Sequence, residues 1–241
     1  MPTASARLSA ELELLLPAYR EPGRMLLEHP RARELCPAYL AAGAYVTLVM
    51  VPVMEAALDR ARTLAPADPV AAGLTGYLEH HIPEEMHGDE PGGEQLEDLA
   101  ALGVDVAALR AGPLPAPVAA LIGTQFFRIR HAHPVSVLGF LWLEAFPPHA
   151  PAVERLIEHT GLPREGFRQL LVHSEVDLRH GPELADALDA LPLESWHERL
   201  VGLSALETMS YMIDAWLEIV GPSDADGADR PASATRRPAP R

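Results

Sequence analysis

The chain has 241 residues, 48% of them hydrophobic, so it is long enough to bury one sizeable core, and wholesale disorder is excluded. Its formal net charge is −15, with 34 acidic residues against 19 basic ones, which excludes the clustered cationic surface that nucleic-acid binding needs. The single cysteine, Cys36, excludes both an internal disulfide and a site built from several thiolates.

The amino-terminal residues lack the layout of a secretory signal, so we expect a cytoplasmic protein. Residues 35–54 contain no charged side chain and are numerous enough to cross a bilayer. Gly43, Thr47 and Pro52 dilute the hydrophobicity of this stretch, and no basic cluster flanks it. We therefore expect a buried central helix and no membrane partner.

Helical spacing of apolar residues recurs along the chain, and no window alternates with a period of two, so an all-α fold is expected. The expected helices cover residues 8–19, 33–64, 74–87, 94–101, 118–130, 135–145, 153–159, 164–180 and 196–220. Pro22 and Pro182, each next to a glycine, should end the first and eighth of them. Residues 221–241 have no apolar periodicity, so we expect a disordered tail after one domain of residues 1–220.

Two of the expected helices carry metal-competent side chains at the same spacing of i, i+4 and i+7. On a helix these positions share one face. One set is His173, Asp177 and His180, and the other is His80, Glu84 and His87. The repeated pattern predicts a metal centre held between two helices.

The neighbours of the upstream set are expected to lie off its face. His81 is about 100° around the helix from that set, so we expect it at the surface or behind the ligands. Glu85 should be solvated or paired with a cation.

Glu144 stands in the apolar run of residues 140–146. Burying this acid is costly unless a cation or hydrogen-bond donors surround it, and a metal ion would meet that need. The alternative is a solvent-facing residue near a helix end. Imidazole and carboxylate donors together suit iron or manganese better than calcium or structural zinc.

These residues carry a resemblance to a known family. Glu84-x-x-His87, the segment 98–103, Gly139 and Glu144, and His173-x3-Asp177-x2-His180 together resemble the haem-oxygenase-like di-iron oxidases, over roughly residues 30 to 220. The most specific part is the His-x3-Asp-x2-His triplet.

The resemblance implies a seven-helix, haem-oxygenase-like bundle that binds two iron ions per chain and uses dioxygen. It implies that one iron is held by Glu84, His87 and His173, and the other by Glu144, Asp177 and His180. It also implies an electron donor, a small-molecule substrate such as a fatty acid, amino acid or amine, and a homodimer. The reactions implied are oxidative decarboxylation, C–C cleavage and N-oxygenation.

Three other functions stay open at this point. A cofactor-independent enzyme of the same fold, similar to thiaminase-type or quinone-biosynthesis enzymes, would use the polar residues as acid–base groups. A ferritin-like protein would bind iron, although the second Glu-x-x-His motif typical of that class is missing. A non-enzymatic interaction protein is the third.

Overall fold

The computed structural model describes residues 2–86 and 92–221, and within them the chain is helical and contains no strand, which confirms the all-α prediction. The helices, with η for 3-10 helices, are α1 (Ala4–Glu13), α2 (Leu16–Glu28), α3 (Ala32–Leu64), α4 (Pro69–Glu85), α5 (Gly93–Ala101), α6 (Val106–Ala111), α7 (Ala116–His131), η1 (Pro134–Ser136), α8 (Val137–Leu141), η2 (Trp142–Ala145), α9 (Ala150–Thr160), η3 (Arg164–Phe167), α10 (Arg168–Ala190) and α11 (Ser195–Val220).

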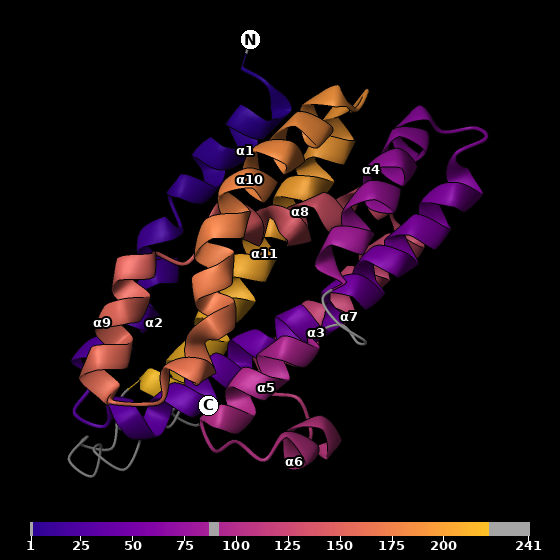
Figure 1. Cartoon of the computed structure of the whole chain (residues 1–241). Helices are drawn as coiled ribbons and strands as arrows, with labels where there is room; N and C mark the ends of the chain where they lie inside the picture. The colour runs from indigo at the N-terminus through magenta and orange to yellow at the C-terminus, as the bar shows by residue number, and fades with distance from the viewer. Residues whose placement is uncertain (1, 87–91, 222–241) are drawn as a thin grey trace, which may run out of the picture.

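The two longest helices, α3 and α11, each pack against several of the other helices. α3 runs the length of one side and packs against α4, α7, α5 and α11 (Figure 1). Its most apolar 18-residue window is long and apolar enough to cross a membrane, and 56% of that window is buried inside the molecule. The uncharged stretch therefore lies within one long helix that is partly buried, where a buried central helix was expected.

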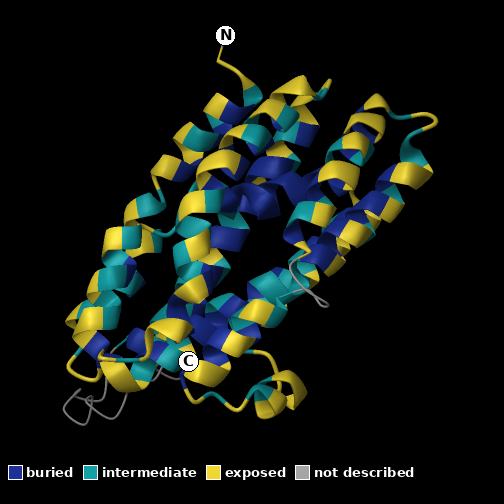
Figure 2. Ribbon diagram, in the orientation of Figure 1, coloured by how far each residue is buried: buried dark blue, intermediate teal, exposed yellow. Residues whose placement is uncertain are grey.

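The short helix α8 lies in the middle of the bundle, where it packs mainly against α11 and also contacts α3, α7 and α10 (Figure 1). All five of its residues are buried, and the dark-blue core of Figure 2 is centred there. A Cβ atom on Gly139 would lie 2.2 Å from the carbonyl oxygen of Val201, so α8 rests directly on the backbone of α11. This close contact fixes the position of η2, which follows at once.

Both helix stops predicted at proline are wrong. Pro22 is buried inside α2; the break falls earlier, because Pro17 lies in the first turn of α2, where a missing N–H breaks no helical hydrogen bond. Pro182 is inside α10, which continues to Ala190 with Leu184 and Leu188 buried. The adjacent Gly181 lets α10 pass close to Ala145 of η2, whose Cα would be 3.2 Å from an added Cβ.

Residues 1, 87–91 and 222–241 lie outside the described residues. The predicted tail, apart from Gly221, therefore falls outside them, and so does His87.

Candidate metal centre

Three of the clustered side chains come from α10. The start of this helix is fixed by Asp98 of α5, which accepts hydrogen bonds from the backbone N–H of Gln169 (2.8 Å) and from Nε of Arg168 (2.9 Å). Below this cap, one face of α10 turns toward the interior of the bundle. It carries the predicted residues His173, Asp177 and His180.

The face of α4 that enters the bundle is the one with Leu74 and Leu78, both fully buried. The same heptad spacing continues to His81, which is 2% exposed, and to Glu85, which is 8% exposed. The expected surface position of His81 and the expected solvation of Glu85 are therefore wrong. His80, in contrast, is exposed.

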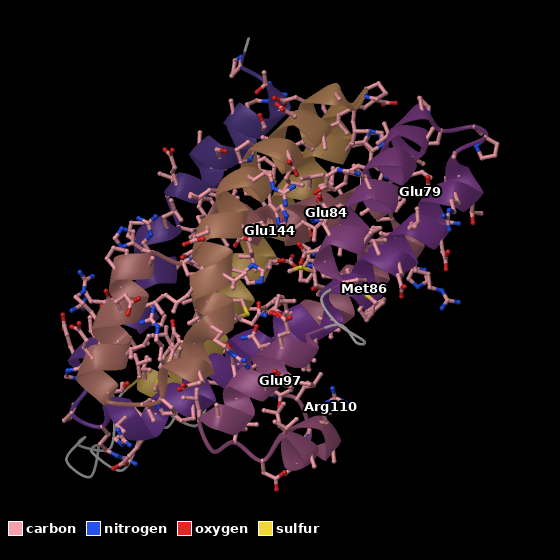
Figure 3. All side chains as sticks on the ribbon, in the orientation of Figure 1. Glu79, Glu84, Met86, Glu97, Arg110 and Glu144 are labelled. Atoms are coloured by element: carbon pink, nitrogen blue, oxygen red, sulfur yellow. The ribbon has the colours of Figure 1, made fainter. Side chains whose placement is uncertain are left out.

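Glu144 is 5% exposed and stands in η2, directly after the buried run of α8 and Trp142. The alternative of a solvent-facing acid is thus wrong. Because α10 packs on η2, the carboxylate of Glu144 is directed toward the side chains of α10 and α4. Figure 3 shows Glu144 and Glu84 in the region between these two helices.

Nitrogen and oxygen atoms on side chains of α4 and η2 lie within 4 Å of one another. Nε2 of His81 lies 3.4 Å from Oε2 of Glu144 and 3.9 Å from Oε1 of Glu85. One donor atom from each of these three residues lies within 4.8 Å of the other two.

α10 completes the arrangement. Nδ1 of His180 lies 3.3 Å from Oε1 of Glu85 and 3.8 Å from both Oε2 of Glu144 and Oδ1 of Asp177. Nδ1 of His173 is hydrogen-bonded to Oδ1 of Asp177 at 3.0 Å. Three imidazoles and three carboxylates from three helices therefore converge, and we call the six residues the donor cluster: His81, Glu85, Glu144, His173, Asp177 and His180.

Two buried acids of the donor cluster, Glu144 and Glu85, have raised pKa values. Burial raises the pKa of Glu144, and the neighbouring His81 offsets only part of the effect. Burial also raises the pKa of Glu85, and the charge of Glu144 adds to the rise. For both acids, burial outweighs the stabilisation that the neighbouring imidazoles give to the ionised form.

The imidazoles respond to their neighbours in different directions. Burial works against charging His81, but the contact with Glu144 and the nearby carboxylates raise its pKa overall. The hydrogen bond that His173 donates to Asp177 raises the pKa of His173. Burial lowers the pKa of His180.

The hydrogen bonding of the donor cluster is incomplete. Buried atoms without a hydrogen-bond partner include Nε2 of His81, Oε1 of Glu85, both carboxylate oxygens of Glu144 and Nδ1 of His180. Buried polar groups are normally paired, so such a concentration at one point requires an explanation. Cations held by these atoms would satisfy them together, and the residues present therefore fit a metal centre.

One contact would have to change on metal binding. Nη2 of Arg179 lies 3.4 Å from Nε2 of His180, and since a guanidinium only donates, this nitrogen accepts and the ring proton is on Nδ1. A metal at Nδ1 needs the proton on Nε2 instead. Arg179 therefore has to release His180 when the site is loaded.

The sequence-predicted residues are distributed as follows. Glu144, His173, Asp177 and His180 belong to the donor cluster. Glu84 lies at its edge, with Oε1 accepting a hydrogen bond from Nη1 of Arg179 at 3.2 Å. His81 and Glu85 also belong to the donor cluster, against expectation, although the spacing of the buried leucines on α4 indicates both.

A second group, Asp68, His133 and His197, also brings three donor side chains together. The backbone N–H of Val135 donates to Nδ1 of His133, and that of Glu194 to Nδ1 of His197, both at 3.1 Å. Each neutral ring therefore carries its proton on Nε2, and that of His133 is donated to Asp68 at 3.0 Å. A metal ion at Nε2 would need the lone pair of that nitrogen, which carries the proton because Nδ1 already accepts a hydrogen bond. We therefore assign the group a structural role: it links Asp68, the cap of α4, to α11.

A narrow cavity reaches the donor cluster between α3, α5 and α10. Its lining includes His173 and Glu85 together with Thr47, Met50 and Gln169. A larger cavity of about 480 Å³ lies between α1, α10 and α11 and shares no residue with the cluster. The narrow cavity is only about 20 Å³, so it has room for about one water molecule beside His173.

No family model and no curated protein matches the chain. Solved structures do. A domain of unknown function with a haem-oxygenase-like fold from Shewanella denitrificans is 16% identical, with 89% of each chain covered and a TM-score of 0.63. The chain has a haem-oxygenase-like fold. A TenA homologue from Pseudomonas syringae pv. tomato is 14% identical, with 90% of this chain and 93% of that chain covered and a TM-score of 0.59.

Proposed function

We propose that the donor cluster binds two iron ions and that the protein is an oxidoreductase that uses dioxygen to oxidise a small organic substrate. The observation that supports this most is the convergence of buried carboxylate and imidazole donors whose hydrogen-bonding capacity is unused. Six donors are enough for two ions that keep open positions. Three carboxylates offset most of the charge of two divalent ions.

The donor types favour iron or manganese. Carboxylates and imidazoles suit these metals, whereas a thiolate site would need cysteine, and the chain's one cysteine, Cys36, is buried in a different cluster of the core. Bound ferrous ions would supply the electrons and the open positions for dioxygen chemistry.

The protein side of the reaction is positioning and the exclusion of water. Asp177 holds the ring of His173 through Nδ1, so its orientation is set before any substrate arrives. Phe140, Leu141 and Trp142 are buried next to Glu144 and keep its surroundings dry. The substrate would be a fatty acid, amino acid or amine, and an outside donor would return electrons to the site.

Anaerobic titration with ferrous iron tests the proposal. We expect about two ions per chain, then oxygen uptake that a substrate of one of these classes accelerates. Glu144→Gln should lose metal binding, while Glu183→Gln, an acid on α10 outside the donor cluster, should retain it. A wild-type protein that binds no iron, or binds it through surface acids unaffected by Glu144→Gln, contradicts the proposal.

The second candidate is a cofactor-independent acid–base enzyme of the thiaminase type. The TenA homologue shares the fold, and the raised pKa values of Glu144 and His173 give the donor cluster groups that can exchange protons. Chelator-treated protein should then turn over thiamin-like substrates at the full rate. Loss of all activity with the metal would decide against this candidate.

A further inference from the structure

One carboxylate oxygen of Glu84 has a hydrogen-bond partner, and the other has none. Its Oε1 accepts from Arg179, whereas its Oε2 is buried and has no hydrogen-bond partner. Oε2 lies 3.8 Å from Nδ1 of His81, three residues earlier on α4. The free oxygen is thus directed at the donor cluster from the outside.

The two nitrogens of His81 face different groups. Nε2 faces Glu144 and Glu85, and Nδ1 faces Glu84. The ring of Tyr77 stacks on that of His81, with centroids 5.2 Å apart and planes 17° apart, and this limits rotation of the imidazole. A histidine ligand needs its proton on the nitrogen that does not bind the metal, and a carboxylate commonly accepts that proton.

We propose that Glu84 is a positioning residue of the metal centre, not a ligand. In the loaded site its Oε2 would move in from 3.8 Å to accept the Nδ1 proton of His81, which leaves the Nε2 lone pair for the metal, and Arg179 holds its other oxygen in place. Glu85 and Glu144 cannot replace it, because both lie on the Nε2 side. This inference rests on the proposed metal centre and reassigns a residue for which the sequence pattern implies direct ligation.

The test measures metal affinity with cobalt(II), whose absorption spectrum also reports coordination. Glu84→Ala should weaken binding by about 10- to 100-fold while leaving two ions per chain and an unchanged spectrum. Glu84→Gln, which keeps an acceptor oxygen and the side-chain volume, should recover part of the affinity and guards against misfolding of the alanine variant. Glu183→Gln is the matched control, because Glu183 also lies near Arg179, at 3.7 Å.

Three results would overturn the proposal. Unchanged affinity in both Glu84 variants would show that the carboxylate only pairs with Arg179. Loss of one cobalt ion with an altered spectrum would show that Glu84 is a direct ligand. If the wild-type protein binds neither cobalt nor ferrous iron, the proposed metal centre fails and this inference fails with it.

Discussion

Oε2 of Glu144 lies 3.4 Å from Nε2 of His81, so an acid on η2 and an imidazole on α4 face each other in a space closed to water. Neither atom has a hydrogen-bond partner at this distance and orientation. The pair therefore brings together two elements that are separated in sequence and attracts a cation or a proton.

Replacing Glu144 by glutamine should change how stability depends on pH. Burial raises the pKa of Glu144, so the stability that this group contributes is present at low pH and is lost as pH rises through the raised value. Glutamine does not ionise. From about pH 5 to pH 8, metal-free Glu144→Gln should therefore gain stability relative to wild type, by at most about 1.4 kcal/mol per pH unit. Urea denaturation at several pH values measures it, and a constant difference would contradict the raised pKa.

Metal loading should release protons. The carboxyl of Glu85 and the imidazole of His81 have raised pKa values, and a metal would displace the protons that they hold. The rise in Tm on adding ferrous iron should consequently be larger at about pH 8 than at about pH 6. A chelator should reverse it, and Glu144→Gln should show little rise at either pH. An equal rise at both values would argue against ligation by these groups.

Gly139→Ala should destabilise the fold strongly. The added Cβ would lie 2.2 Å from the carbonyl oxygen of Val201 and 2.8 Å from the backbone nitrogen of Ala205, and neither backbone atom can rotate away. We expect a loss of about 1–3 kcal/mol or more in the free energy of unfolding. Gly76→Ala is the control: nothing lies within 4 Å of its Cβ, and alanine should stabilise α4 there by about 0.5–1 kcal/mol.

Asp98→Ala should remove the cap of α10. The buried carboxylate receives the backbone N–H of Gln169 and Nε of Arg168, so its loss should cost about 1–2 kcal/mol. The neighbouring Glu97 also contacts Arg168, but on the surface, and Glu97→Ala should cost much less. Denaturant titration of both variants measures the difference; equal effects would show that the cap contributes little.

Much of the α10 part of the site could be predicted from sequence, because His173, Asp177 and His180 share one face at any helical phase. Glu144 was predictable from the cost of burying an acid within an apolar run. On α4 the same spacing argument selected His80 and Glu84, but His80 is exposed and Glu84 lies at the edge of the donor cluster, because the buried leucines set the rotation of the helix; His87 lies outside the described residues. The spacing of those leucines continues to His81 and Glu85, which lie on the same buried face of α4.

The helix boundaries show a different limit. A proline inside a helix removes one hydrogen bond, which packing can offset, and Pro22 and Pro182 are both tolerated in this way. Whether a helix stops at proline depends on neighbours that sequence does not reveal. At Gly181 the neighbour is the backbone of η2.

The polar contacts that the structure describes between α4 and α10 are those of the donor cluster and the Glu84–Arg179 ion pair. Metal ions bound there would link the two helices to each other. Amide hydrogen exchange along α4 should then slow on loading, since opening α4 locally would require the ions to leave first. The supply of iron would in this way determine how often α4 opens locally.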